Sequence, residues 1–168
     1  TRRAQFYIDH PWFIEAGEAI PVHKENPPMG GDYPLSLTSG HSRWSMHSMN
    51  QADRLMLETH RGQPTVLLNT ADAAARGIRD GETVRVHNDL SSILAQVKVS
   101  GAVRPGQVIS YNGWEPYQYA DWKHVAEVEP GMVKWLHFAG GEGHLRYWLT
   151  QWQPVPIDRA FRVEVEPA

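Results

Sequence analysis

Short apolar stretches, most of which alternate with polar residues, constrain the fold of this chain more than any other feature of its sequence. Each stretch is bounded by a turn that contains glycine or proline, which predicts half-buried β-strands. The chain has 12 Pro, 14 Gly and 7 Trp in 168 residues, a composition typical of a loop-rich β protein rather than a helical bundle. We expect six strands, at residues 34–40, 64–68, 83–86, 92–99, 108–111 and 161–166.

Local signals predict two short helices. Asn69 or Thr70 follows a predicted strand and can cap a helix over residues 71–76, which Gly77 would end. A second short helix is expected over residues 11–15. The chain is therefore predicted to be mainly β with few helical residues.

Two turn-and-strand segments resemble each other. Residues 77–84 and 102–109 share the order apolar, Arg, turn, Gly, polar, strand. Such a repeat is typical of a small barrel made of two interlocked halves with pseudo-twofold symmetry. Chance similarity between two tight turns is the alternative, and short motifs leave both interpretations open.

The domain organisation follows from composition. Five prolines and two adjacent glycines interrupt residues 1–34, so we expect an extended arm there, whose aromatic residues predict that it packs against something. Residues 35–168 are expected to form one domain. Residues 112–160 show no clear period, which indicates a functional or docking loop. The start, Thr1-Arg2-Arg3, is neither an initiator Met nor a signal peptide, so we expect a segment of a longer protein.

Composition also disfavours several functions. The absence of cysteine excludes disulfides, thiolate catalysis and cysteine-ligated clusters on this chain. A net charge of −3 gives no field that would attract nucleic acid or an anionic membrane. No apolar run approaches the roughly 20 residues of a membrane span. No Gly-x-Ser-x-Gly elbow supports a hydrolase.

The densest polar cluster covers residues 38–50. It combines hydroxyls, a turn with free backbone amides, one arginine and two imidazoles, which suits a ligand that carries phosphate. A hydroxyl-rich surface turn is the alternative. His41 and His47 are six residues apart, which does not match the spacing of helical zinc sites, so no metal site is expected.

Two further loops carry candidate binding groups. Asn88 and Asp89 follow a predicted strand and offer an amide and a carboxylate to a purine edge, with an ordinary Asx turn as the alternative. Residues 139–144 are rich in glycine, but no strand–loop–helix unit surrounds them as in a dinucleotide fingerprint. Close backbone approach to a ligand and a flexible turn are equally compatible with this loop.

Together these segments resemble the C-terminal domain of the catalytic subunit of molybdenum enzymes in the dimethyl sulfoxide reductase family. The branch is that of nitrate reductase, ethylbenzene dehydrogenase, dimethyl sulfide dehydrogenase and selenate or chlorate reductase. The arm, at residues 6–11 and 21–25, resembles the segment that precedes this domain. The resemblance covers nearly the whole chain in five ordered blocks, at residues 37–48, 68–81, 87–89, 113–117 and 139–145.

The resemblance implies a double-psi β-barrel with short helices and long aromatic and glycine-rich loops. It also implies that the domain binds molybdopterin guanine dinucleotide, with the pterin and pyrophosphate near the first strand and the nucleotide end near Asn88. The implied cofactor-binding residues are Thr38, Ser39, Gly40, His41, Trp44, Ser45, His47, Asn88, Asp89, Trp114, Gly141, Gly143 and His144. No catalytic residue and no metal ligand is implied on this chain; the protein ligand of the metal and the cysteines of the iron–sulfur cluster belong to earlier domains of such subunits.

Two departures limit this transfer of contacts. The family often has an aromatic residue where this chain has Glu142, and Asn69-Thr70 replaces the commoner Asn-Pro. The implied function is cofactor binding within a dehydrogenase or oxyanion reductase, with no activity of the chain alone. The implied partners are the remaining domains of the catalytic subunit and an iron–sulfur electron-transfer subunit. The alternatives are a partner-docking or maturation module and a free-standing small enzyme on the same barrel; substrate and compartment stay open.

Overall fold

The computed structural model describes residue 4 and residues 6–15, 19–20, 30–43, 45–59, 62–129 and 159–168. Its contacts divide the chain into two units. The first comprises residues 1–27 and 131–157, and the second comprises residues 28–130 and 158–168. The expected division into an arm of residues 1–34 and a barrel of residues 35–168 stays a prediction.

In the first unit, the structure describes one short helix, α1 (Pro11–Glu15). It lies where the sequence predicts it. Next to it, the Ile8 backbone N–H donates a hydrogen bond of 2.8 Å to the Ala19 carbonyl oxygen.

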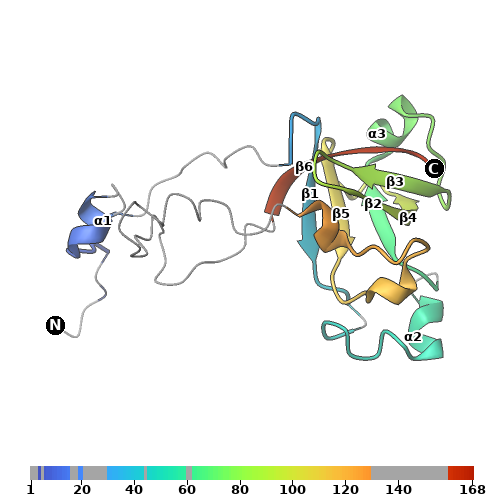
Figure 1. The fold of residues 1–168 in the computed structure, drawn as a ribbon, viewed down its shortest axis with the longest axis horizontal. Coiled ribbons are helices and arrows are strands. Elements are labelled where there is room, and N and C mark those ends of the chain that lie inside the picture. The colour runs from blue at the N-terminus through green and yellow to red at the C-terminus, as the bar shows by residue number, and fades with distance from the viewer. Residues whose placement is uncertain are drawn as a thin grey trace. The chain divides into compact units, whose positions relative to one another are not determined.

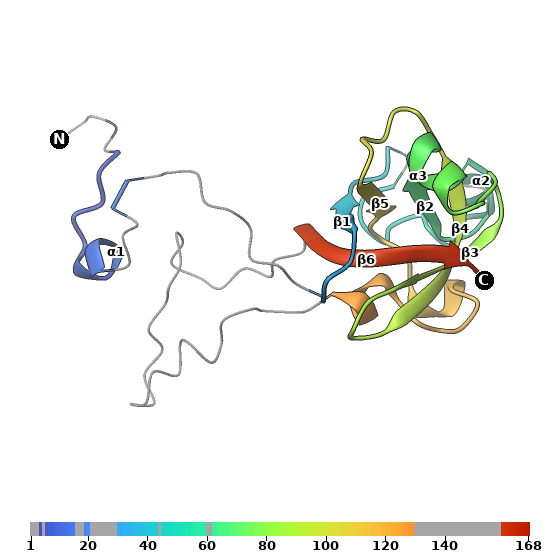
Figure 2. The same ribbon diagram turned by 90° about the horizontal axis from the view of Figure 1, so that it is seen from above.

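The second unit contains a closed barrel of six strands, and every predicted strand is confirmed (Figures 1 and 2). The strands follow one another around the barrel in the order β1-β5-β2-β4-β3-β6. Their bounds are β1 (Leu35–Gly40), β2 (Thr65–Leu68), β3 (Thr83–His87), β4 (Ser92–Val99), β5 (Gln107–Tyr111) and β6 (Arg159–Pro167).

The strand order has the twofold symmetry of a double-psi barrel. The pairs β1–β5 and β2–β4 are parallel, and the other four pairs are antiparallel. Exchanging β1 with β4, β2 with β5 and β3 with β6 maps every pair onto a pair of the same direction. Two interlocked halves of three strands therefore build this barrel, as the resemblance to the family implies.

The sequence repeat that suggested this symmetry does not follow it. Residues 77–84 lead into β3 and residues 102–109 lead into β5, and the symmetry does not exchange these strands. The similarity has a local cause, since Gly81 and Gly106 both have positive φ, 85° and 79°, in tight turns before a strand. The interpretation of these two segments as a symmetric repeat was wrong. Their likeness is the chance similarity of two tight turns.

The core lies inside the barrel, where one side chain in two points inward along each strand. Burial of each such aliphatic side chain stabilises the fold by roughly 1.5–3 kcal/mol. Those that are at most 1% exposed are Leu35, Leu37, Val66, Leu68, Val84, Val86, Ile93, Val97, Val108, Val163 and Val165.

Helix α3 (Thr70–Ala75) confirms the predicted cap and stop. Asn69 is the N-cap: its Oδ1 accepts from the Ala71 N–H at 2.7 Å. Gly77 follows the helix with φ 67°. The Oδ2 of Asp72 accepts from the Gly106 N–H at 2.7 Å, which ties α3 to the turn before β5.

Three further elements were not predicted. Helix α2 (Arg54–Thr59) begins after Asp53, whose Oδ1 accepts from the N–H groups of Leu55 and Met56. Two 3-10 helices, η1 (Pro116–Gln118) and η2 (Val125–Val128), lie in the stretch without a clear period. Among the described residues, no helix has the length and apolar character needed to cross a membrane.

Candidate functional site

The first cluster of candidate residues is the turn after β3. The Asn88 side chain is 7% exposed and makes four hydrogen bonds. Its Nδ2 donates to the carbonyl oxygens of Val128, at 2.5 Å, and Arg162, at 3.3 Å. Its Oδ1 accepts from the N–H groups of Leu90, at 2.9 Å, and Ser91, at 3.3 Å. Since an amide offers two donors and two lone pairs, Asn88 is fully used in building the turn.

The neighbouring Asp89 is exposed, and a segment from before the barrel holds it in place. Its Oδ1 accepts a hydrogen bond of 2.9 Å from the Tyr33 hydroxyl. Its backbone N–H donates to the Gly30 carbonyl oxygen at 3.0 Å. The hydrogen bond between the Tyr33 hydroxyl and the Asp89 carboxylate, together with burial, raises the pKa of the Tyr33 hydroxyl, so the phenol is the donor at neutral pH.

Two glycines make this approach sterically feasible. Gly30 and Gly31 have φ of 85° and 107°, in the region that favours glycine. A Cβ at Gly30 would lie 2.7 Å from the Asn88 Nδ2, and one at Gly31 would collide with the Asp89 Oδ2. The double glycine therefore lets the segment pass directly against the turn after β3.

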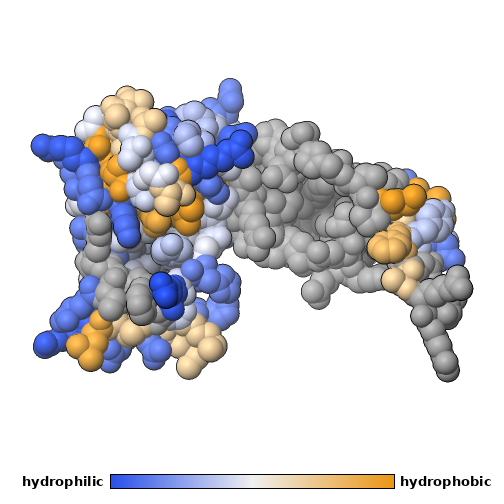
Figure 3. All heavy atoms as spheres, turned by 180° about the vertical axis from the view of Figure 1, so that it is seen from behind, coloured by the Kyte–Doolittle hydropathy of each residue, from blue (hydrophilic) through white to orange (hydrophobic). Residues whose placement is uncertain are grey.

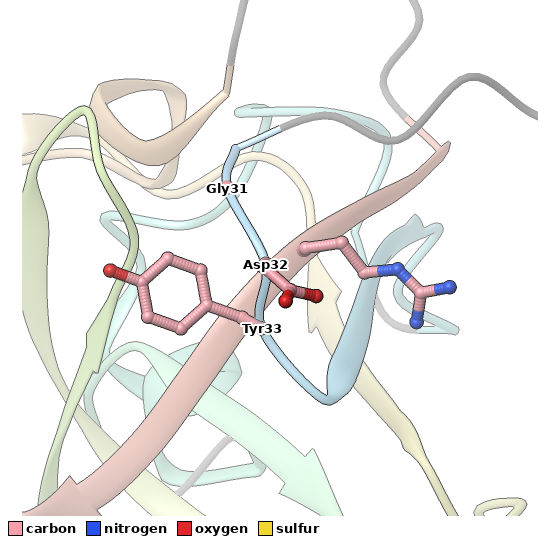
Figure 4. Close-up of a pocket in the computed structure, with 4 residues that line it drawn as sticks. Gly31, Asp32 and Tyr33 are labelled. Atoms are coloured by element: carbon pink, nitrogen blue, oxygen red, sulfur yellow. The ribbon is translucent and has the colours of Figure 1, made fainter.

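A cavity of about 620 Å³ lies beside the segment that contacts this turn, within the size range of ligand pockets. Figure 4 shows the Tyr33 ring and the Asp32 carboxylate on different sides of the segment that carries them. The described residues that line the cavity are Gly31, Asp32, Tyr33 and Arg162. They combine a glycine backbone, an aromatic ring, a carboxylate and a guanidinium group, which can together bind a nucleotide.

This wall of the cavity was missed from the sequence, because residues 30–34 were assigned to the arm. Its most visible signal was the Gly30-Gly31 pair just before a predicted strand, which is more than a turn requires. Arg162 had no signal of its own, because it is one exposed residue of an alternating strand.

The second cluster lies at the end of β1 and in the segment that follows it. The Thr38 hydroxyl donates to the Val108 carbonyl oxygen at 3.4 Å and accepts from the Gln107 Nε2 at 3.1 Å. The Thr38 side chain therefore takes part in the parallel pairing of β1 with β5. Ser39 is exposed, and a Cβ at Gly40 would lie 3.2 Å from the Tyr111 ring.

His41 and His47 come together at the surface. Both are exposed, and their rings lie 5.2 Å apart at an angle of 65°. His47 has φ of 52°, and Gly113 packs so closely that a Cβ there would collide with the His47 carbonyl group. The structure thus places the histidine pair beside the loop that follows β5.

A buried glutamine joins this segment to η1. Gln51 is 1% exposed; its Nε2 donates to the Ser45 hydroxyl at 3.1 Å, and its backbone carbonyl oxygen accepts from the Gln118 Nε2 at 2.9 Å. Trp114, which precedes η1, is 4% exposed. Ser45, His47 and Trp114 are therefore held in neighbouring, connected segments.

The remaining predicted residues, Trp44, Gly141, Gly143 and His144, lie outside the described residues. Within the described part of the chain, no group of three or more His, Asp or Glu residues has the arrangement of a metal site.

Comparison with known proteins identifies relatives over the whole chain. The chain is 34% identical to the dimethylsulfide dehydrogenase subunit alpha of Rhodovulum sulfidophilum and 36% identical to the respiratory nitrate reductase subunit alpha of Haloferax mediterranei. Both alignments cover 100% of this chain but only 19% and 18% of the relatives. The chain thus spans about a fifth of the length of these curated relatives.

A solved structure shows the same fold. Acetylene hydratase from Pelobacter acetylenicus superposes with a TM-score of 0.70 at 17% identity, over 93% of this chain and 22% of that one. The family model described as the molydopterin dinucleotide binding domain matches residues 35–133, which is more than half of the chain. The barrel, the relatives and this match agree, and the chain belongs to the molydopterin dinucleotide binding domain family.

Proposed function

We propose that this chain is the molybdopterin guanine dinucleotide-binding domain of the catalytic subunit of a molybdenum oxidoreductase, either a dehydrogenase or an oxyanion reductase. The observation that carries the proposal is the cavity lined by Gly31, Tyr33 and Arg162, whose Tyr33 is hydrogen-bonded to Asp89, within a domain of the molydopterin dinucleotide binding family. Activity, substrate and partners belong to the longer protein, because the chain spans about a fifth of its relatives.

The donor set of the cavity fits the nucleotide end of this cofactor. Guanine presents two adjacent N–H donors, at N1 and N2, that a carboxylate such as Asp89 can accept together, whereas adenine has no such pair. The Arg162 guanidinium suits the diphosphate, since planar guanidinium groups bind phosphate oxygens in pairs. Because a side chain at position 31 would collide with Asp89, glycine is required there, and its lack of a side chain leaves this wall of the cavity open to the ligand.

We assign different roles to the two residues that were predicted to hold the nucleotide. Asp89 is the ligand contact, because its carboxylate is exposed and is hydrogen-bonded to Tyr33, which lines the cavity. Asn88 is a structural residue that holds the turn in place, because all four of its hydrogen-bonding positions are used within the chain.

The segment after β1 is proposed to face the pterin. When bound, the molybdenum and its pterin dithiolenes would supply the electron-pair and oxygen-atom chemistry. Ser39, His41 and His47 are exposed there, and the imidazoles can donate hydrogen bonds to a polar heterocycle. We assign the histidines to tuning of the pterin rather than to catalysis. Gly40, Ser45 and the predicted residues of the 139–144 loop complete this proposed surface, and Trp114 lies buried in the neighbouring segment.

An exposed apolar surface supports the proposed partner, the rest of the catalytic subunit. Figure 3 shows apolar side chains at the end of the barrel that carries α2. Three exposed apolar residues of this region are Met46, Met49 and Leu55, each more than 60% exposed. Exposed apolar patches mark interaction surfaces. An iron–sulfur electron-transfer subunit is a further proposed partner of the whole enzyme, and a docking or maturation module is the alternative function.

The test is a titration of this chain with guanosine monophosphate and with extracted molybdopterin guanine dinucleotide, followed by amide NMR shifts. We expect the mononucleotide to shift signals of residues 30–33, Asp89 and Arg162. The dinucleotide should in addition shift residues 39–47. A folded chain whose amide signals respond to neither compound would contradict the proposal and favour the docking module.

A further inference from the structure

We propose that Tyr33 is a positioning residue that fixes the Asp89 carboxylate for guanine and thereby contributes to the choice of guanine over other purines. The inference rests on the proposed function, because it assumes that Asp89 contacts the base. It adds a residue from outside the barrel strands, 56 positions before Asp89 in the sequence.

Asp89 is held on three sides although it is exposed. The Tyr33 hydroxyl donates to Oδ1, the backbone N–H is bonded to Gly30, and Oδ2 lies against Gly31. An exposed aspartate without such contacts samples several rotamers and loses that freedom when it binds a ligand. Here the Tyr33 hydroxyl holds the carboxylate before a ligand arrives, so less of that freedom is left to lose.

Tyr33 is itself held by the strand that leads to Asp89. Its ring meets the His87 ring edge to face, with centroids 5.6 Å apart and planes at 82°. His87 is the last residue of β3, two positions before Asp89. Tyr33 is half-buried and also lines the cavity. The ring therefore connects the strand end, the carboxylate and the cavity wall.

Charge and chemistry favour this direction of the hydrogen bond. The tyrosine oxygen keeps its proton at neutral pH and donates it in the hydrogen bond to the Asp89 carboxylate. The carboxylate is the acceptor in this bond and has further lone pairs to accept from a ligand. A fixed acceptor pair matches the N1–H and N2–H donors of guanine. Hypoxanthine lacks the amino group at C2 and would leave one acceptor without a partner.

The test compares binding of guanosine monophosphate and inosine monophosphate by a cofactor-free preparation of the longer protein that carries this chain. We expect wild type to prefer the guanosine nucleotide by about ten- to hundredfold, the effect of one hydrogen bond to a charged acceptor. Tyr33→Phe, which keeps the ring against His87, should remove most of this preference by weakening guanosine binding. The unfolding midpoint should stay the same, which a merely structural role of Tyr33 would not predict.

A matched control and a second readout separate the outcomes. Tyr117→Phe, at an exposed tyrosine of η1, should leave the preference at the wild-type value. In the free protein, Asp89→Asn should lower the pKa of Tyr33 toward its ordinary value, observed by NMR of the labelled tyrosine ring. If Tyr33→Phe keeps the full preference for guanosine, the role of Tyr33 is overturned and the proposed function stands. If wild type binds neither nucleotide, both fail.

Discussion

The turn after β3 and the segment after β1 are both candidate binding regions, but they are built in opposite ways. At the first, Asn88 is buried and saturated with hydrogen bonds, and Asp89 is held from outside the barrel. At the second, His41 and His47 contact each other at the surface and are both exposed. The polar groups of the first region are bonded within the chain, whereas those of the second region are exposed and available to a ligand or another domain.

This difference suggests how the domain would bind a long ligand. A preorganised turn binds without loss of side-chain freedom, so it can provide specificity for the nucleotide. An open surface gains its specificity when a second wall covers it, and the relatives are about five times longer than this chain. The comparison predicts large effects on stability at the turn and small ones at the histidines.

The largest effect on stability is expected for Asn88→Ala. The change removes donors to carbonyl oxygens in two different segments, at Val128 and Arg162, and leaves those oxygens in a buried place. We expect a loss of about 3 kcal/mol in the free energy of unfolding, measured by urea denaturation. Asp89→Ala is the control and should cost less than about 1 kcal/mol, because its side chain is exposed. Equal losses of unfolding free energy in the two variants would contradict the assignment of Asn88 to the structure of the turn and of Asp89 to the ligand.

A smaller loss is expected for Gly113→Ala. Gly113 has φ of 99°, and a Cβ would meet the backbone of His47. We expect a loss of about 2 kcal/mol in thermal or urea unfolding. Gly101→Ala serves as the control, because no atom lies within 4 Å of its Cβ position, and its stability should change by less than about 0.5 kcal/mol. A neutral Gly113 variant would show that the loop does not support the histidine segment.

An effect of about 1 kcal/mol, dependent on pH, is expected at Glu164. Burial opposes ionisation of this carboxyl group, but hydrogen bonds from Arg76, at 2.7 Å, and from the Val165 N–H outweigh it and lower the pKa of Glu164. A lowered pKa stabilises the fold above the ordinary value near 4.5, and this contribution is lost as the pH falls through the folded value.

Glu164→Gln should therefore be less stable than wild type at pH 7, and the difference should shrink as the pH falls below 4.5. Urea denaturation between pH 3 and 7 measures it. Glu166→Gln is the control for an exposed ion pair, formed with Arg85, and should change stability less. A difference between Glu164→Gln and wild type that stays constant over this range would rule out the ion pair with Arg76 as its source.

The smallest effect on stability is expected for the double variant His41→Gln with His47→Gln. Both side chains are exposed, so the free energy of unfolding should change by about 0.5 kcal/mol or less. In the loaded full-length enzyme, the same variant should alter turnover or the potential of the metal. Unchanged turnover, potential and cofactor content would exclude the tuning role.

The features that could be predicted from the sequence were the strands and helices that are determined by residues close together along the chain. Alternation located five strands, a short apolar run located the strand at residues 64–68, and the Asn69 cap with the Gly77 stop located α3, because these signals act within a few positions. Helix α2 was missed, since its six residues are too few to show a helical period. The resemblance to a known family, rather than any local pattern, supplied the double-psi barrel.

The candidate site was less predictable because its contacts join distant segments. Asp89 was a candidate from its place after a strand, but its partner Tyr33 lies 56 positions away in a segment assigned to the arm. The role of Asn88 was also hidden, since its partners Val128 and Arg162 are brought to it only by the closed barrel. Patterns in a sequence report periodicity and turns, and they do not report which distant carbonyl group an amide will meet.

The most direct test of the central claim measures the guanosine monophosphate released by acid from the purified full-length enzyme that carries this chain. The variants are Asp89→Ala and, as a control at an exposed carboxylate of α2, Glu58→Ala. We predict that Asp89→Ala contains several-fold less releasable nucleotide than wild type, while Glu58→Ala is unchanged. A wild-type content of nucleotide in Asp89→Ala would contradict the assignment of this turn to the nucleotide end of the cofactor.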